Sequence, residues 1–485
     1  MASGDLTSAE LVAGYLDRIA RIDRTGPRVN AVLELDPDAE AQARALDAER
    51  ANGTVRGPLH GIPVLVKDNI ATAGAAGTTA GSLALAGVRA LHDAPLVARL
   101  RGAGAVILGK TNLSEWANIR SVRSTSGWSA VGGLTRNPHA LDRSTSGSSS
   151  GSGAAVAASL ATVAIGTETD GSIVSPSSIT GIVGLKPTVG LVSRDGVIPI
   201  SSSQDTAGPM TRTVADAAAV LQAIADLTDV PEDLAARRPA SPPDYLAALD
   251  AGALRGARIG VVRSMLEGDP AVAALVERAL DDLRAAGADL VDVVLPSTTE
   301  YRDAELVVML VELVAGLPGY LRAYAPHAPV HDLADVVAFN RSHAERELAR
   351  FGQDRFERAL ELGGLDDPEY LAARAHARDL ARGGLDAAFR GHGLDAVVAP
   401  TNGPSWVIDF ISGDHYPASF STPAAVAGYP HLTVPAGFVA GLPVGLSFVG
   451  PAWSEPRLLA LGHAYEQATR HRRDPAYAAT VTDLG

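Results

Sequence analysis

The stretch that most constrains this chain is residues 144–172, where two clusters of glycine, serine and threonine stand close together. The first cluster is residues 147–153 and the second is residues 166–172. A helix pattern of small residues, 154–162, and a short apolar run, 163–165, separate them. Glycine at this density permits positive φ and lets the backbone approach a ligand closely. Consecutive N–H groups in such turns can bind an anion or a developing oxyanion. The serine hydroxyls of both clusters therefore suggest nucleophilic catalysis by serine.

The composition is that of a globular protein. The chain has 485 residues, of which 46% are hydrophobic and 20% are charged, and this excludes a disordered protein. The net charge of −14 argues against nucleic acid or an anionic membrane surface as a partner. The chain has no cysteine, which excludes thiol nucleophiles, disulfides and cysteine metal sites. Because residues 1–16 lack a signal-peptide pattern and no run of 18 apolar residues occurs, we expect a cytoplasmic protein without a membrane span.

Helix and strand patterns alternate along the whole chain without an internal repeat, which is typical of one α/β domain around a large sheet. We expect a helical N-terminal layer at about residues 5–55 and a catalytic core at about 57–227. A linker rich in proline follows at about 231–243, and a helical cap or lateral layer at about 303–390. The first helix has a capping box, formed by Thr7 and Glu10.

Lys67 stands near the end of an apolar strand pattern, residues 64–68. A lysine behind three aliphatic residues can be desolvated, which lowers the pKa of its amine and allows a neutral form. The alternative is a lysine that extends to the surface or pairs with Asp68. Local sequence alone favours this second interpretation, in which Lys67 has no catalytic role.

Residues 104–111, GAVILGKT, match the phosphate-loop pattern letter for letter. That loop must follow a strand, and its middle residues must be free to curl around phosphates. Here the middle consists of four aliphatic residues, which is the composition of a strand core. We therefore reject a nucleotide site. The polar stretch 118–127, between Trp116 and Trp128, could line the mouth of a pocket, although core is the commoner role for tryptophan.

A known sequence motif gives a second interpretation of the first serine cluster. Residues 147–151 fit G-x-S-x-G, the nucleophile elbow of α/β-hydrolases, with Ser149 as the nucleophile. An elbow requires an apolar strand directly before it, whereas residues 136–146 are polar and irregular. The nearest candidate for its histidine base is His431, which precedes a strand pattern.

Several phrases together resemble the amidase signature family. They are GPLHGIPVLVKDNI at 57–70, GKTNLSEWA at 109–117, GSS at 147–149, GTETDGSI at 166–173, GLKPT at 184–188, GLPVGLSFVGPAW at 441–453 and AYEQAT at 464–469. They cover nearly the whole chain, and within the family the phrases SGWSA and SQDTAGPM are most similar to bacterial peptide amidases. The resemblance implies an α/β fold, a single large domain with a central mixed β-sheet covered by helices.

The resemblance also implies a Ser-cisSer-Lys triad. Lys67 matches the family's lysine, Ser148 its bridging serine after a cis peptide bond, and Ser172 its nucleophile. The backbone N–H groups of Thr169, Asp170, Gly171 and Ser172 match the oxyanion hole, and Ser149 could support the relay. No metal or cofactor is expected.

Two departures from the family pattern bear on the substrate. Most members have glycine where this chain has Ser146, and many have glycine at Asp170, whose carboxylate would disfavour anionic substrates at the hole. Several relatives carry an arginine shortly after the nucleophile that grips a carboxylate, but residues 173–175 offer no charge. This weakens a malonamidase-like or tRNA-amidotransferase interpretation and favours a neutral or extended amide.

We therefore expect a serine amidohydrolase whose substrate is a small-molecule or peptide amide, with a C-terminal peptide amide as the first choice. A broader aryl- or alkyl-amidase with esterase activity is the alternative within the class, and a catalytically idle amide-binding protein is the alternative outside it. Residues 300–345 and 400–425 are expected to shape the pocket, with Trp406, Phe410 and Tyr416 in a binding wall. The sequence defines no oligomeric state.

Overall fold

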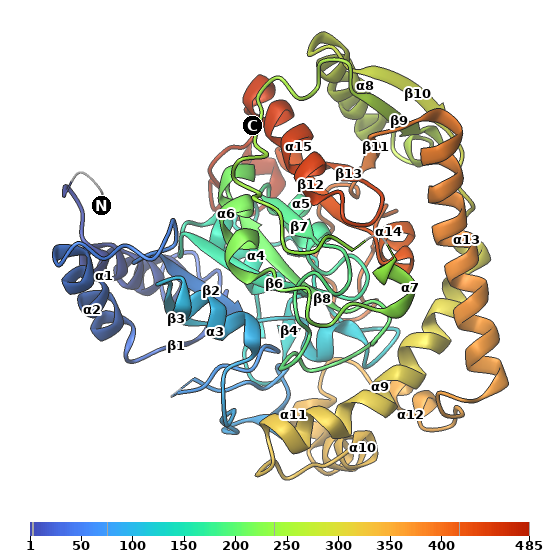
Figure 1. Cartoon of the computed structure of the whole chain (residues 1–485). Coiled ribbons are helices and arrows are strands. Elements are labelled where there is room, and N and C mark those ends of the chain that lie inside the picture. The colour runs from blue at the N-terminus through green and yellow to red at the C-terminus, as the bar shows by residue number, and fades with distance from the viewer. Residues whose placement is uncertain (2–3, 75, 237, 417, 485) are drawn as a thin grey trace.

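The computed structural model describes residues 1, 4–74, 76–236, 238–416 and 418–484. One mixed sheet of eleven strands runs through these residues (Figure 1). Its strands lie in the order β1 (Val32–Leu35), β3 (Val106–Thr111), β2 (Pro63–Lys67), β6 (Val163–Glu168), β8 (Thr206–Thr211), β7 (Val183–Lys186), β12 (His431–Val439), β13 (Leu442–Val449), β11 (Ala396–Pro400), β9 (Arg258–Val262) and β10 (Asp289–Val293). The neighbours β3, β2 and β6 are parallel, as are β11, β9 and β10, and the other pairs are antiparallel.

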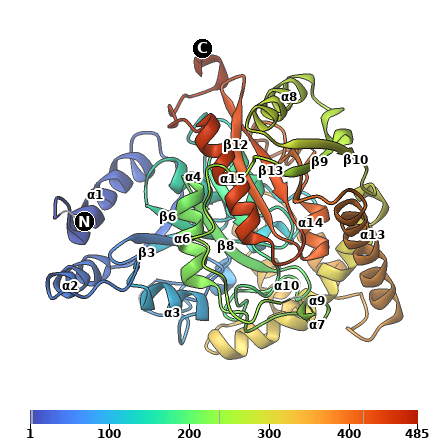
Figure 2. The ribbon, with the colours of Figure 1, turned by 45° about the horizontal axis from the view of Figure 1, so that its top comes forward.

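Helices cover both faces of this sheet, so alternate side chains of a strand enter different cores. Leu65 lies in one core, whereas its neighbours Val64 and Val66 lie in the other. The first face is covered by α1 (Ser8–Arg18), α2 (Ala39–Ala51), α4 (Ser150–Ala157) and α5 (Val174–Ile179). The second face is covered by α3 (Pro95–Gly102), α6 (Val214–Ile224), α8 (Pro270–Ala285) and α15 (Glu455–Thr469), and α6 and α15 cross it side by side in Figure 2.

The remaining elements lie beside the sheet and connect its strands. The lateral helices are α9 (Arg302–Tyr324), α10 (Leu333–Ser342), α11 (Ala344–Glu347), α12 (Asp354–Ala359) and α13 (Pro368–His392), and the connections contain α7 (Glu232–Ala235) and α14 (Thr422–Ala427). A separate hairpin consists of β4 (Trp128–Ser129) and β5 (Gly133–Leu134). The short elements are the π-helix η1 (Ile19–Arg24) and the 3₁₀ turns η2 (Leu83–Leu85), η3 (Glu115–Asn118), η4 (Arg263–Leu266), η5 (Thr298–Glu300) and η6 (Val481–Leu484). The predicted single α/β fold is confirmed, and the predicted lateral layer corresponds to α9–α13.

Helix α9 is long and apolar enough to cross a membrane by length and composition, and half of its most apolar stretch is buried inside the protein. It packs against α12 and α13. Its buried Glu312 accepts hydrogen bonds from Ser201 Oγ at 2.6 Å, from Ser203 Oγ at 2.6 Å and from Tyr370 OH at 2.7 Å. These polar bonds hold α9 to α13, through Tyr370, and to the loop between β7 and β8, through Ser201 and Ser203.

Several local predictions are confirmed. The Thr7–Glu10 capping box begins α1. The aliphatic centre of residues 104–111 lies in the buried strand β3, so those residues form no phosphate loop. Trp116 and Trp128 are both buried, each edge-on to a phenylalanine ring. The linker at 231–243 stays a prediction; this stretch contains the short helix α7, whose Leu234 is buried in a hydrophobic cluster.

The helix after the first serine cluster differs from its prediction. The sequence predicts residues 154–162, but α4 begins at Ser150, inside the cluster, and ends at Ala157. All eight of its residues are buried. A Cβ at Gly151 would lie 2.5 Å from Asn112 O and 2.7 Å from Asn112 N, and closer still to Ala31 O. The glycines therefore allow a helix to touch the backbone of neighbouring segments, and this contact outweighs their low helix propensity. Likewise, the second cluster begins as strand, because β6 continues to Glu168.

This close approach predicts that Gly151→Ala destabilises the protein by about 1–3 kcal/mol or more, because the added methyl group meets backbone that cannot rotate away. The expected result is a lower melting temperature. Gly14→Ala in α1 is the matched control, since a Cβ there meets nothing within 4 Å and alanine favours the helix. A Gly151→Ala protein as stable as the wild type would show that α4 is not held by this contact.

Candidate active site

The buried end of β2 presents an amine to two hydroxyl groups. Lys67 Nζ lies 2.8 Å from Ser148 Oγ and 2.9 Å from Thr167 Oγ1, and it also donates to Thr167 O at 3.3 Å. The side chain has no exposed surface. Burial lowers the pKa of Lys67 to about 7, although the charges of Asp205 and Glu168 act in the opposite direction. A substantial share of the amine is therefore neutral near pH 7.

Thr167 is held in place from two sides. Strands β2 and β6 are parallel and adjacent, with Val66 opposite Ile165, so their ends bring Lys67 and Thr167 together. Ser149 Oγ accepts a hydrogen bond from Thr167 N at 3.2 Å and donates to Thr167 O at 3.0 Å. Asn69 Nδ2 donates to Thr167 Oγ1 at 2.9 Å. Ser149 thus fixes the residue that contacts Lys67, which fits the supporting position predicted for it.

The structure brings Ser148 into contact with Lys67 and joins the two serine loops through the backbone. The Gly147–Ser148 peptide bond is cis. Ser149 N donates to Ser172 O at 3.1 Å. Ser172 borders a large cavity, and its Oγ forms no hydrogen bond with another described residue, including Ser148. Ser148 is therefore engaged by the lysine, whereas the Ser172 hydroxyl is free to meet a ligand.

The turn before Ser172 has unused N–H groups. None of the N–H groups of Thr169, Asp170, Gly171 and Ser172 donates a hydrogen bond to another described residue. Gly171 has φ of +77°, a conformation that glycine adopts readily. The next two N–H groups, those of Ile173 and Val174, both donate to the carboxylate of Glu168, at 2.7 and 3.0 Å.

The carboxylates of Glu168 and Asp170 lie at the turn before Ser172, and both accept hydrogen bonds there. Asp170 Oδ2 accepts a hydrogen bond from Thr422 Oγ1 at 2.7 Å, and its other oxygen is buried without a partner. Burial raises the pKa values of Glu168 and Asp170, and the nearby Lys186 opposes this shift. No group of three His, Asp or Glu side chains within the described ranges is arranged to hold a metal ion.

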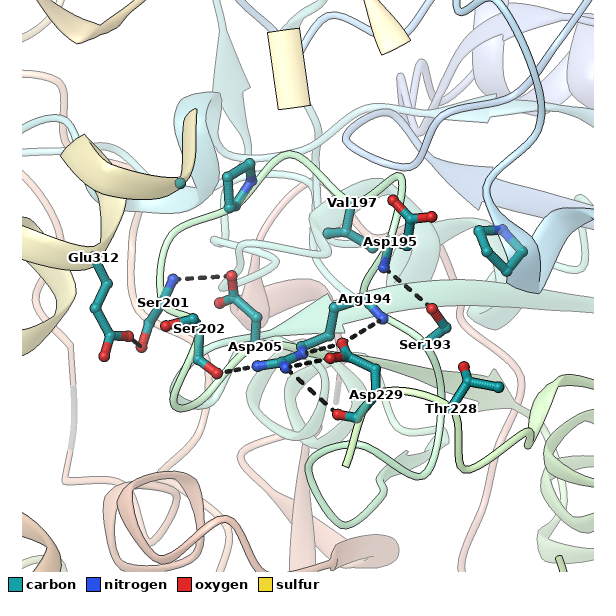
Figure 3. Close-up of a pocket in the computed structure, with 13 residues that line it drawn as sticks. Ser193, Arg194, Asp195, Val197, Ser201, Ser202, Asp205, Thr228, Asp229 and Glu312 are labelled. Carbon is teal, nitrogen blue, oxygen red and sulfur yellow. Dashed lines mark hydrogen bonds and ion pairs between the residues drawn. The ribbon is translucent and has the colours of Figure 1, made fainter. Parts of the chain in front are cut away.

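A second cavity of about 480 Å³ is bordered by Asp205, which is hydrogen-bonded to Thr169 of the turn before Ser172 (Figure 3). Asp205 Oδ1 accepts from Thr169 Oγ1 at 2.6 Å, and its Oδ2 accepts from the N–H groups of Ile200 and Ser201. Burial raises the pKa of Asp205 to about 6. Figure 3 shows the cation of this cavity, Arg194, facing Asp229, and two hydrogen bonds of 2.6 and 2.8 Å join them. The charge of Arg194 is therefore already neutralised.

Ser172 faces a larger cavity of about 590 Å³, a size typical of a ligand site. It is bordered by the two serine loops, by the polar stretch 118–126, by the lateral helices α9 and α12, and by the loop 412–422. The pocket-mouth prediction for residues 118–127 therefore has support. Arg302 and Met309 belong to the stretch 300–345 that was predicted to shape the pocket, whereas Arg355 lies outside both predicted stretches, because only the packing of the lateral helices brings it to the cavity.

Of the three aromatic residues predicted in the binding wall, only Tyr416 lines the cavity. Its hydroxyl donates to Ser175 Oγ at 3.0 Å. Trp406 is buried, packs edge-on against Tyr416 with 5.2 Å between ring centroids, and donates to Asp414 at 3.1 Å. Phe410 lies under the guanidinium of Arg350 at 4.2 Å. Trp406 and Phe410 are not among the residues that border the cavity, so a role for them in substrate binding stays a prediction.

The contacts disfavour the alternative with Ser149 and a histidine base. Ser149 Oγ is bound to the backbone of Thr167 through both the N–H and the C=O of that residue. His431 is buried in β12, where its Nε2 lies 2.6 Å from Ser447 Oγ, and it makes no hydrogen bond to Ser149. Burial lowers the pKa of His431 to about 3.

Comparisons with known proteins agree with this geometry. The family model described as Amidase matches residues 10–459. The crystal structure of native peptide amidase from Stenotrophomonas maltophilia superposes with a TM-score of 0.92 at 55% identity, over 98% of this chain and 96% of that chain. The complex of the peptide amidase PAM with the competitive inhibitor chymostatin gives 0.93, also at 55% identity and over the same shares of the two chains. A probable amidase of Arabidopsis thaliana is 39% identical over 487 residues, covering 98% of this chain and 89% of the relative.

Proposed function

Since this chain belongs to the amidase family, we propose that it is a serine amidohydrolase that cleaves C-terminal peptide amides and releases ammonia. The observation that carries the proposal is the buried amine of Lys67, whose pKa is lowered to about 7, at 2.8 Å from Ser148 Oγ. The similarity to peptide amidases over nearly the full length supports a peptide as the acyl part. A cytoplasmic location stays a prediction of the sequence.

In the proposed mechanism, neutral Lys67 takes a proton from Ser148, Ser148 takes one from Ser172, and Ser172 Oγ attacks the amide carbonyl carbon. The free N–H groups of residues 169–172 stabilise the oxyanion that forms on the carbonyl oxygen. The relay then returns a proton to the nitrogen, ammonia leaves, and an acyl-enzyme remains on Ser172. Water hydrolyses this ester through the same relay and regenerates the free serine.

This mechanism predicts that Ser172→Ala and Lys67→Ala each lose ammonia release from a peptide amide by about a thousandfold or more, because each removes a group that the relay needs. Ammonia is measured over a panel of peptide amides and simple carboxamides. Ser124→Ala is the matched control, since Ser124 borders the same cavity but its hydroxyl only donates to Ser121 O.

Full activity of Ser172→Ala would exclude Ser172 as the nucleophile and return attention to Ser149. A serine-directed fluorophosphonate gives an independent check, because we expect it to attach to Ser172 and not to Ser149. Turnover of simple aryl or alkyl amides without turnover of peptide amides would identify the broader amidase instead, and an inert but amide-binding protein would identify the idle alternative.

The pKa of Lys67 predicts how the rate depends on pH. Since the relay needs the neutral amine, kcat/KM should rise with pH through about 7 and level off above it. Asp205 raises the pKa of Lys67 through its negative charge. Asp205→Asn should therefore move this rise to lower pH, while Asp195→Asn, which changes a carboxylate of the second cavity, should leave it in place. A rise that stays unmoved in Asp205→Asn would show that Lys67 does not set the profile.

A further inference from the structure

One arginine on the wall of the larger cavity has no partner. Arg355 in α12 borders the same cavity as Ser172. Its guanidinium forms no hydrogen bond or ion pair with another described residue, and its Nε is buried without a partner. Burial lowers the pKa of Arg355, yet an arginine stays protonated at any physiological pH. The charge of the adjacent Asp354 acts on Arg355 only through space, without a hydrogen bond or ion pair, so the partly buried guanidinium is costly in the empty protein.

Two carboxylates, that of Asp354, which precedes Arg355, and that of Asp414 in the same cavity, already accept hydrogen bonds from other groups. Asp354 accepts hydrogen bonds from Ser121 Oγ at 2.5 Å and from Val122 N at 3.2 Å. Asp414, which borders the same cavity, accepts from Ser126 N at 3.0 Å and from Trp406 Nε1 at 3.1 Å. These bonds hold the polar stretch 118–126 in place, and neither carboxylate forms a hydrogen bond with Arg355.

Two other arginines of the described residues, Arg120 and Arg194, are paired with carboxylates, which distinguishes them from Arg355. Arg120 forms ion pairs with the buried carboxylates of Glu115 and Glu347. Arg194 in the second cavity is bound twice by Asp229 (Figure 3). Arg120 and Arg194 are thus held by carboxylates in direct contact, whereas Arg355 has no direct contact of this kind.

The cavity also carries a negative group at the nucleophile turn. Asp170 borders the cavity, one of its carboxylate oxygens is unpartnered, and it forms no ion pair with Arg355. Arg302, the other lining cation, has a mostly exposed side chain and lies 3.7 Å from Asp303. A substrate that enters the cavity therefore meets an acidic group beside the hydroxyl of Ser172 and an unsatisfied basic group on the wall formed by α12.

We infer that Arg355 is a specificity-determining residue that binds a carboxylate carried by the acyl part of a peptide amide, away from the bond that is cleaved. This inference rests on the proposed function. The neutral carboxamide lies at Ser172, where a carboxylate would be repelled by Asp170, and an acidic side chain of a preceding residue pairs with Arg355. An arginine can bind such a carboxylate through two parallel N–H···O bonds, which gives both strength and orientation.

The test compares peptide amides that differ only by Glu or Gln at one of the two residues preceding the amide-bearing residue. These side chains have nearly the same size and differ in charge. At one of these positions we expect the wild type to favour Glu over Gln by about tenfold or more in kcat/KM, as a charge-assisted bond would give, mostly through KM. In Arg355→Gln this ratio should fall to about one, and Arg355→Glu should favour a peptide with Lys at that position. Arg358→Gln, on the same helix with an exposed side chain paired to Glu361, should keep the wild-type ratio.

A stability measurement separates this role from a structural one. If Arg355 serves the ligand, Arg355→Gln should keep or raise the melting temperature, whereas Arg120→Gln should lower it because two buried carboxylates lose their partner. A wild-type ratio near one at both positions, or a ratio that survives in Arg355→Gln, overturns the inference while peptide amidase activity stands. An equal loss on the Glu and Gln peptides would mean that Arg355 binds the peptide backbone and also overturns it. No ammonia release from any peptide amide would overturn the proposed function itself, and this inference with it.

Discussion

The burial of the Lys67 amine at the end of β2 is the constraint on which the site depends. A buried ammonium is unfavourable, and here the groups in direct contact with it are neutral oxygens of Ser148 and Thr167. The carboxylates Asp205 and Glu168 act on it through space without forming an ion pair with it. This balance lowers the pKa to about 7 and keeps the lysine between its two protonation states. A closer carboxylate would hold the proton on the amine and remove its capacity to act as a base.

Much of the surrounding structure maintains this contact. The parallel pairing of β2 with β6 brings Lys67 and Thr167 together, and Ser149 holds the backbone of Thr167 by both its N–H and its C=O. Helix α4 sets the position of Ser148 and Ser149, and it can do so because Gly151 lets it rest directly on the backbone at Ala31 and Asn112. Part of the glycine content of the first cluster thus serves close packing of a helix rather than a flexible loop.

The sequence predicted the fold class and the meeting of Lys67 with Ser148 through the family phrases, and periodicity alone would not have joined residues 81 positions apart. Local patterns predicted the strands β2, β3 and β6, because burial on both faces of a sheet leaves a clear apolar run. They failed where tertiary contact decides the outcome. The start of α4 depends on packing against other segments, and Arg355 reaches the cavity only through the packing of α12.

The carboxylate of Glu168 determines which N–H groups remain for a ligand. Every helix begins with N–H groups that have no partner within the helix, and α5 begins at Val174, two residues after Ser172. Glu168 accepts from Ile173 and Val174, so the first N–H groups beyond the turn are already occupied. An N–H group bound to a carboxylate cannot also stabilise an oxyanion. The free donors of this turn are therefore those of residues 169–172, next to the Ser172 hydroxyl, which is bound to no other described residue.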